Sequence, residues 1–255
     1  MSDWDAERYH RLSTPQLAWG RAVLDRLNPR PGERVLDVGC GTGRLTAEIA
    51  SATGSFTVGL DRSAAMLAEA VEHAGRVVAF VRGDGARLPF VQAFDAVFSG
   101  ATFHWIPDHD QLFGSIYDAL RPGGRLVAQC GGGPNLRRLL DRAHALMDSP
   151  DYAHHFGTWS DPWRFAGPDD TRARLGRAGF SGIEAWLEPA PTTLPDRAAF
   201  ENFISCVCVR HHVDRLPPAV RPHFVGALAD AAAEDEPPYT LDYWRLNIGA
   251  RRGAA

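Results

Sequence analysis

The segment 35–43, which reads VLDVGCGTG, constrains the fold of this chain more than any other stretch. A short apolar run leads directly into three glycines at alternating positions, and apolar residues at helical spacing follow them. Glycines let the backbone turn tightly and approach a ligand closely, while the start of the next helix offers free N–H groups. The segment therefore predicts a strand, a ligand-binding turn and a helix in direct succession.

Strand-like apolar runs alternate with helical patterns through most of the chain. Strands are predicted at 34–38, 56–60, 77–81, 94–99, 125–129, 183–187 and 240–252. Alternation of this kind is typical of α/β folds, and continuous apolar strands indicate burial on both faces of the sheet. We therefore predict a doubly wound, mainly parallel seven-stranded sheet with helices on both faces.

The chain after Gly133 loses this alternation, and residues 197–233 are largely helical. A helical insertion between two late strands is placed to act as a lid over a ligand site. We predict four regions: an N-terminal helical flap (1–30), a ligand-binding core (31–133), core helices with a late strand and a helical substrate lid (134–236), and a final strand with a tail (237–255).

Composition limits the partners and the compartment. The net charge is −4, so no large basic surface is indicated, and nucleic acid or an anionic membrane is disfavoured as a partner. No apolar run approaches the roughly 18 residues that span a bilayer, and the polar N-terminus is unlike a signal peptide. Cys40 and Cys130 follow apolar strands and indicate buried free thiols in a reducing compartment. We expect a cytoplasmic protein with a small-molecule substrate; the sequence does not indicate its oligomeric state.

Two acidic residues accompany the glycine turn. Asp61 ends the second predicted strand and Asp84 ends the third. Carboxyl ends of parallel strands meet at one edge of the sheet, where a carboxylate can accept hydrogen bonds from both ribose hydroxyls. The combination predicts a nucleoside site. A dinucleotide is disfavoured, because the G-x-G-x-x-G spacing fails at Arg44 when counted from Gly39.

At this point the sequence resembles the class I S-adenosylmethionine-dependent methyltransferases. The segments VLDVGCGTG, GLDRS, GDGARLPF, FDAVFSGATFHW and LRPGGRLVA stand in the order and spacing of that family, over roughly residues 30–130. The flanks, including LDYWRLNIGARR, are similar to the trans-aconitate methyltransferase-type branch of small-molecule enzymes. The resemblance implies a Rossmann-like methyltransferase fold and S-adenosyl-L-methionine as cofactor.

The resemblance also implies roles for individual residues. Asp61 would hold the ribose hydroxyls, Asp84 would accept from the adenine amino group, and the Gly85 N–H would face the ring. Asp37 would order the turn or the bound amino group, or would be a buried acid satisfied by local N–H groups. The implied cofactor-binding residues are Tyr9, Gly39, Gly41, Gly43, Asp61, Arg62, Asp84, Gly85 and Ala101.

The acceptor side is indicated by a short local match. Tyr9, Ser13, Gln16 and Trp105 resemble a pattern in plant salicylate-type carboxyl methyltransferases, where glutamine and tryptophan donate hydrogen bonds to the substrate carboxylate and tyrosine lies near the cofactor. Insect juvenile hormone acid methyltransferases are similar locally. A carboxylate is already deprotonated at neutral pH and needs no base. We therefore predict O-methylation of a small carboxylic acid by in-line transfer, with Gln16 and Trp105 as a carboxylate clamp.

Several alternatives stay open. Gln16 can instead form a capping box with Ser13, although Pro15 as the first helical residue would make Thr14 the cap. O-methylation of a hydroxyl or phenol would need a base, for which His104 or His211 is a candidate. C- or N-methylation and a non-catalytic S-adenosylmethionine-binding protein are further alternatives.

The segment CVCVRHH has the residue types of a metal site but not the spacing. It lacks a C-x-x-C pair, and Cys206 would point away from the helix face that Cys208 shares with His211 or His212. We therefore expect no metal and predict instead an apolar stripe in the lid. The stripe consists of Phe200, Phe203, Ile204, Val207 and Cys208. His211 and His212 remain candidates for the wall of the substrate pocket.

Overall fold

A computed structural model describes residues 14–72 and 77–254 of the chain. The chain divides into two compact units. The first is built from the chain up to Gly133, from Trp163–Glu188 and from the chain beyond Arg245; the second consists of Pro134–Pro162 and Pro189–Trp244. Tyr9 and Ser13 lie outside the described residues, so their predicted roles stay predictions.

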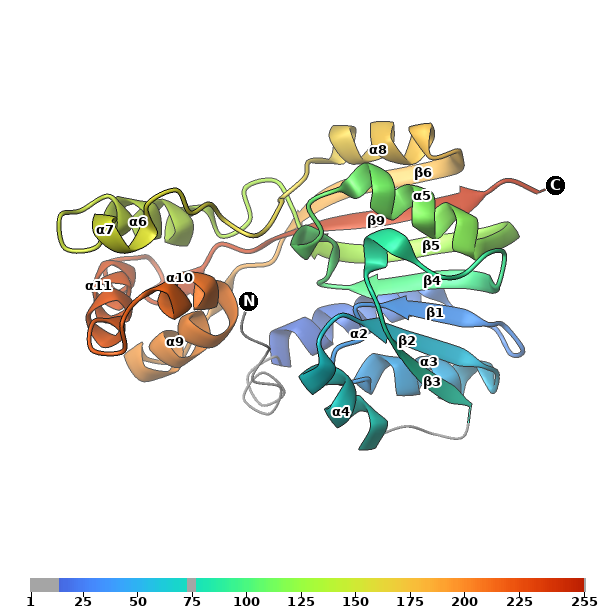
Figure 1. Ribbon diagram of the computed structural model, residues 1–255, viewed down its shortest axis with the longest axis horizontal. Helices are drawn as coiled ribbons and strands as arrows, with labels where there is room; N and C mark the ends of the chain where they lie inside the picture. Colours follow the sequence, from blue (N-terminus) through green and yellow to red (C-terminus); the bar gives the residue numbers. More distant parts are fainter. Residues whose placement is uncertain (1–13, 73–76, 255) are drawn as a thin grey trace. The chain divides into compact units, whose positions relative to one another are not determined.

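The first unit contains a seven-stranded sheet, as predicted, in the order β3-β2-β1-β4-β5-β9-β6 (Figure 1). Its strands are β1 (Val35–Val38), β2 (Thr57–Asp61), β3 (Val78–Arg82), β4 (Phe94–Gly100), β5 (Leu120–Gly131), β6 (Phe180–Pro189) and β9 (Trp244–Arg252). The pairs β1–β2, β1–β4, β2–β3 and β4–β5 are parallel, whereas β5–β9 is antiparallel. The strand order reverses direction at β1, which places the end of β1 beside the ends of β2 and β4.

The fifth strand begins earlier than the sequence predicts. The segment 121–124, which precedes the predicted strand 125–129, lies within β5, and the register shifts so that Phe94 pairs with Leu120 while Ala96 pairs with Arg125. The extra residues form an irregularity at the entry of the strand. The exit of β5, at Gly131, is unaffected.

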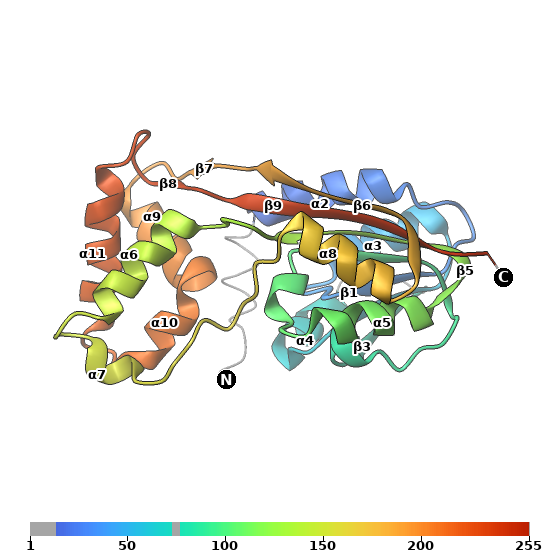
Figure 2. The same ribbon diagram turned by 90° about the horizontal axis from the view of Figure 1, so that it is seen from above.

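Helices cover both faces of the sheet, as predicted. They are α2 (Thr14–Leu27), α3 (Arg44–Thr53), α4 (Ala64–Glu72), α5 (His109–Ala119) and α8 (Pro168–Arg177). Val35 packs in one core cluster with residues of α2 and α3, while the adjacent Leu36 packs in another with residues of α5 and α8 (Figure 2). Because side chains alternate along a strand, Asp37 falls on the same face as Val35, toward α3.

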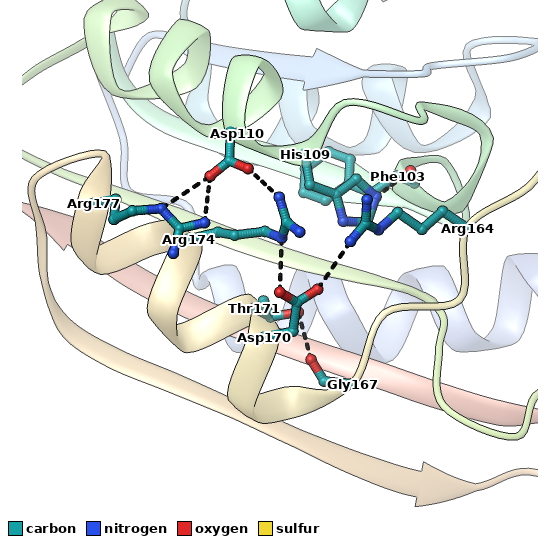
Figure 3. A network of polar contacts seen from close by, with 9 residues as sticks. All are labelled: Phe103, His109, Asp110, Arg164, Gly167, Asp170, Thr171, Arg174 and Arg177. Carbon is teal, nitrogen blue, oxygen red and sulfur yellow. Dashed lines mark hydrogen bonds and ion pairs between the residues drawn. The ribbon is translucent and has the colours of Figure 1, made fainter.

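Helices α5 and α8 are joined by charged side chains (Figure 3). Asp110 of α5 pairs with Arg174 and with Arg177, the latter at 2.6 Å, and Asp170 of α8 accepts from Arg174 at 3.0 Å. Asp170 also pairs with Arg164 at 3.3 Å. These pairs hold the incoming segment of α8 against the start of α5.

The second unit is mainly helical and covers only part of the predicted region 134–236, because Trp163–Glu188 belongs to the first unit. It contains α6 (Arg137–Met147), α7 (Ala153–Phe156), α9 (Arg197–Phe203), a π-helical turn η3 (Ile204–Cys208), α10 (Arg210–Arg215), α11 (Arg221–Ala233) and a small sheet of β7 (Thr192–Thr193) with β8 (Thr240–Leu241). The chain enters this unit twice, once after Gly133 and once after β6. Helices α6 and α7, which precede β6 in the sequence, therefore belong to the same compact unit as the helices that follow β6. The sequence alone did not indicate this.

All four cysteines carry free thiols, as predicted for Cys40 and Cys130. Cys206 and Cys208 are both buried, at 4% exposure each. Both lie in a π-helical turn, whose spacing differs from the α-helical spacing on which the predicted orientation of Cys206 relied, so that orientation stays a prediction. No helix within the described ranges is long and apolar enough to cross a membrane.

Candidate active site

The turn after β1 has the close-approach geometry that its glycines predict. Gly39 has φ +77°, and a Cβ built on it would lie 2.0 Å from the Oγ1 of Thr102. Gly41 has φ +53°, and a Cβ there would meet no atom within 4 Å. Gly39 is therefore required by the packing of the turn against β4, whereas Gly41 faces open space.

Asp61 links the turn to the end of β2. Its carboxylate accepts the Gly41 N–H at 2.9 Å through Oδ2 and the Ser63 N–H at 2.9 Å through Oδ1. Each carboxylate oxygen has a second lone pair, so the group can accept further hydrogen bonds from a ligand. The predicted ribose acceptor is thus fixed in orientation by two backbone donors.

A cavity of about 360 Å³ opens along the carboxyl ends of β1, β2, β3 and β4. Its volume is in the range of small-molecule and cofactor sites. Predicted site residues among its lining are Gly39, Gly41, Asp61, Arg62, Asp84, Gly85, Ala101 and Trp105. The structure therefore brings together residues that lie far apart in the sequence.

Asp84 and Gly85 form one wall of this cavity. Asp84 caps a short 3₁₀ helix, η1 (Gly85–Arg87), and its Oδ1 accepts the Ala86 N–H at 3.0 Å. A Cβ on Gly85 would lie 2.9 Å from the Cδ1 of Ile106 and 3.0 Å from the Cγ1 of Val38. The Gly85 backbone therefore packs tightly against Ile106 and Val38, with Asp84 beside it in the wall of the cavity.

A smaller cavity of about 90 Å³ adjoins the first and shares Gly39, Gly41, Gly100 and Ala101 with it. Asp37 lines it from below the turn. The Asp37 carboxylate is buried and accepts the Thr46 hydroxyl at 2.6 Å. Burial raises the pKa of Asp37 to about 7, partly offset by the Thr46 hydrogen bond and reinforced by the charge of Asp61. A cationic ligand beside Asp37 would therefore stabilise its charged form.

Gln16 lines the same smaller cavity, from the first turn of α2. Its Oε1 is buried, and within the described part of the chain no donor lies within hydrogen-bonding distance of it. Helix α2 is described from Thr14 onward, so whether Ser13 or Thr14 caps it falls outside the described residues. Since buried polar atoms are rarely left unsatisfied, the side chain of Gln16 is available to a ligand.

Trp105 and His104 follow β4 in a 3₁₀ turn, η2 (Phe103–Trp105), but they differ in what they face. Trp105 lines the larger cavity and packs edge-to-face on Trp163, with ring centroids 5.7 Å apart. His104 lines neither cavity; its Nδ1 accepts the Gly131 N–H at 3.3 Å. Burial and the charge of Arg245 hold the pKa of His104 well below its ordinary value. The ring is thus neutral, and its one basic nitrogen is occupied.

Two predicted site residues, Gly43 and His104, line neither cavity, and several lining residues were not predicted. Gly43 is the N-cap of α3 and lines neither cavity; a Cβ there would meet the ring of Phe80 at 2.8 Å. Cavity residues that the sequence did not single out are Leu60, Met66, Thr102, Ile106 and Gln111. Ile106 could have been found, because it directly follows Trp105 at the end of a buried strand; Met66 carries no such signal.

The arrangement fits S-adenosylmethionine. The two cavities share Gly39 and Gly41, a Cβ on Gly41 would meet no atom within 4 Å, and Asp61 and Gly85 line the larger cavity. The smaller cavity places the acidic Asp37 where an amino group would lie. The glycine turn lacks the G-x-x-x-x-G-K-[ST] spacing of a phosphate-binding loop, which agrees with a nucleoside cofactor that lacks phosphate.

Comparison with known proteins agrees with this geometry. The methyltransferase domain family matches residues 35–124. A trans-aconitate 2-methyltransferase from Deinococcus radiodurans is 39% identical over 127 residues, which are 49% of this chain and 48% of that protein. Another from Methylobacterium radiotolerans is 28% identical over 273 residues and covers 100% of both chains.

A solved structure shares the fold. Haemonchus contortus phosphoethanolamine N-methyltransferase 2, in complex with phosphomonomethylethanolamine and S-adenosylhomocysteine, superposes with a TM-score of 0.63 at 21% identity, covering 98% of this chain and 57% of that one. The sheet order, the glycine turn and the strand-end carboxylates define a class I S-adenosylmethionine-dependent methyltransferase. Within that class the chain is similar to the trans-aconitate 2-methyltransferases, with which it aligns along its whole length.

Proposed function

We propose that this enzyme transfers a methyl group from S-adenosylmethionine to a carboxylate oxygen of a small organic acid. The observation that carries the proposal is the absence of a histidine from the walls of both cavities, as far as the described residues go. A hydroxyl or phenol acceptor must lose a proton during transfer, and histidine is the usual base near neutral pH. A carboxylic acid has already lost its proton at neutral pH, so a carboxylate acceptor needs no base.

His104 does not meet the requirements of a base. Its Nδ1 already accepts the Gly131 N–H, so its Nε2 carries the proton of the neutral ring and acts as a donor. His109, on α5, donates its Nε2–H to the Phe103 carbonyl at 3.0 Å and is not among the described residues that line either cavity (Figure 3). Burial, together with Arg164 and Arg174, lowers the pKa of His109, although the Phe103 hydrogen bond opposes this.

Gln16 and Trp105 are the proposed clamp for the acceptor carboxylate. Gln16 lines the smaller cavity and Trp105 the larger, and the two cavities adjoin at the glycine turn. The amide of Gln16 can present either its oxygen or its NH₂ group to the cavity by rotation. Two neutral donors orient a carboxylate without the strong charge-assisted pairing that would reduce its nucleophilicity.

The chemistry at this site consists of alignment and desolvation. Bound S-adenosylmethionine supplies a methyl group already activated by the positive charge of its sulfur. The residues of this chain then have to hold the acceptor oxygen in line behind that methyl and exclude water from both. In the proposed clamp, the Gln16 amide and the Trp105 indole N–H orient the acceptor, and the Trp105 ring also provides an apolar wall beside it.

The relatives support an acid as the substrate class. The proteins that align with this chain over its full length are named trans-aconitate 2-methyltransferases, and that name denotes a carboxylic acid substrate. Their identity to this chain is below 30%, so the body of the acid is left open. We further propose that the second, helical unit is a substrate lid, since the chain inserts it between β6 and β9.

The clamp is tested by substitution at its two residues. Gln16→Ala and Trp105→Phe should each lower kcat/KM for the acid at least about tenfold, because each loses one hydrogen bond to the acceptor. Gln16→Glu should lower it further, because it places a negative charge against the carboxylate. The dissociation constant for S-adenosylmethionine, measured by calorimetry, should change little in Trp105→Phe. Unchanged turnover in all three variants would remove the clamp.

A further inference from the structure

We propose that the helical unit holds a zinc ion between His144, Asp161 and His212. His144 lies on α6, Asp161 in the segment that leads out of the unit, and His212 on α10. One ligand atom from each residue, two imidazole nitrogens and a carboxylate oxygen, lies within 4.8 Å of the other two. Nothing in the reaction at the glycine turn requires these residues, and the proposal stands whether or not a carboxylate is the acceptor.

The distances suit a bound ion. His144 Nε2 lies 2.9 Å from Asp161 Oδ2, and His212 Nε2 lies 3.4 Å from Asp161 Oδ1. Ligands at the usual zinc–nitrogen and zinc–oxygen lengths of about 2.0–2.2 Å stand roughly 3.3–3.5 Å apart in a tetrahedron. The three ligand atoms, now within 4.8 Å of one another, would have to draw together to about this spacing around a bound ion.

The surroundings have the layout of a metal site rather than of a surface charge cluster. His212 is fully buried, at 0% exposure, and its ring packs on Trp159 at 4.7 Å and on Phe224 at 6.5 Å between centroids. The side chains of His144 and Asp161 are 44% and 23% exposed. The cluster thus has an apolar back wall that holds one ligand and an open side through which an ion and a water molecule can enter.

Zinc fits this donor set better than the other common ions. Magnesium and calcium prefer all-oxygen ligands, whereas two imidazoles with one carboxylate are suited to zinc. Three protein ligands leave the fourth position to water. The neighbouring cysteines are not part of the cluster; burial raises the pKa of Cys208 to about 12, and its Sγ lies 3.2 Å from the hydroxyl of Tyr243.

The position of the site defines its role. Its three ligands come from segments far apart in the sequence, on both passages of the chain through the helical unit. An ion bound there would cross-link these segments in the folded state but not in the unfolded chain, so it would raise the stability of the unit. We therefore assign the ion a structural role and expect no direct part for it in methyl transfer.

The test uses full-length enzyme that has been stripped with a chelator and then given one equivalent of zinc. The wild type should retain close to one zinc per chain after gel filtration and should melt at a higher temperature than the stripped protein. Asp161→Asn and His144→Gln should lose zinc affinity at least about tenfold and should lose the zinc-dependent rise in melting temperature. His223→Gln is the matched control, because His223 is an exposed histidine of the same unit outside the cluster.

Cobalt distinguishes this site from binding to the thiols. Cobalt(II) in place of zinc should give the visible bands of a tetrahedral nitrogen–oxygen site without a thiolate charge-transfer band, and Asp161→Asn should abolish them. Zinc that fails to stay bound to wild-type protein would overturn the proposal, as would retention unchanged in both ligand variants. If those variants fold poorly, the melting temperature of the stripped wild type with and without zinc still decides the matter, since no shift means no site.

Discussion

The Asp61 carboxylate accepts the Gly41 N–H at 2.9 Å, so the end of β2 is tied directly to the glycine turn that follows β1. The same carboxylate also accepts the Ser63 N–H. One side chain thereby fixes the turn, and it is also the predicted acceptor for the ribose hydroxyls. The cofactor site and the local fold at the end of the two strands depend on the same group.

We expect Asp61→Asn to weaken S-adenosylmethionine binding at least about tenfold. The substitution removes the negative charge and replaces one of the two acceptor oxygens by an NH₂ donor, so the backbone and ribose hydrogen bonds can no longer all form. Asp25→Asn, an exposed acid on α2, is the control and should bind as the wild type does. Calorimetric titration of each protein with S-adenosylmethionine measures the effect. Equal affinities for the two variants would mean that Asp61 makes no contact with the cofactor.

The packing of the turn predicts different results for two glycines. Gly39 and Gly32 both have left-handed φ angles, +77° and +85°, but a Cβ on Gly39 would meet Thr102 at 2.0 Å while one on Gly32 would meet nothing within 4 Å. Gly32→Ala should therefore lower the free energy of unfolding by about 1 kcal/mol, the cost of the left-handed backbone alone. Gly39→Ala should lower it by ~2 kcal/mol or more, because steric overlap is added.

Chemical denaturation of the two glycine variants measures this difference. A loss at Gly39 no larger than that at Gly32 would show that the turn yields easily to Thr102. That result would weaken the assignment of Gly39 as a fixed element of the site.

Asp37 predicts a pH dependence with a definite sign. Its pKa is raised to about 7 from an ordinary 3.8. The stability contributed by this group is therefore fully present at low pH and is lost as the pH rises from about 4 through 7, because the unfolded chain gives up the proton first. Asp37→Asn should remove that part of the pH dependence of the free energy of unfolding.

The binding of cofactor should show the opposite trend. If the amino group of S-adenosylmethionine lies beside Asp37, affinity rises as the pH passes through about 7, where the carboxylate gains its charge. Calorimetry at several pH values detects this step, which Asp37→Asn should abolish. An affinity that is flat across that range in the wild type would place the amino group elsewhere.

Replacing His104 should not change how kcat/KM depends on pH. Since its Nδ1 is engaged by the Gly131 N–H, His104→Gln should leave the shape of the pH profile of kcat/KM unchanged and lower its height only modestly. The profile is measured with an accepted acid between about pH 5.5 and 8.5, a range that spans the titration of an ordinary histidine. Loss of a rising limb in the variant would instead make His104 a base and favour a hydroxyl acceptor.

The sheet and the cofactor end of the site could be predicted because local patterns determine them. VLDVGCGTG combines a buried strand with glycines, and acids at the ends of parallel strands must converge at one edge. The predicted strands are present, except that the predicted final strand 240–252 divides into β8 (Thr240–Leu241), in the small sheet, and β9 (Trp244–Arg252), in the large one; β5 and β6 are longer than expected. The lining residues Met66 and Gln111 could not be predicted, because ordinary helix positions gain their role only from tertiary packing.

The helical unit shows the limit of sequence reading more clearly. The segment CVCVRHH has the residue types of a metal site but not the ligand spacing, so the sequence predicted no metal. The structure instead brings His212 together with His144 and Asp161, which are distant in the sequence. A cluster assembled by tertiary packing has no spacing that a single segment could reveal.

The most direct test of the central claim identifies the atom that is methylated. The enzyme is incubated with S-adenosylmethionine carrying a labelled methyl group, a panel of small mono-, di- and tricarboxylic acids, and the amides and alcohols of the same carbon skeletons. Mass spectrometry and the sensitivity of the product to alkaline hydrolysis define the product. The account predicts labelled methyl esters from one or more acids and none from the matched amides and alcohols. Label in an alkali-stable ether or amine, with no ester formed, would contradict it.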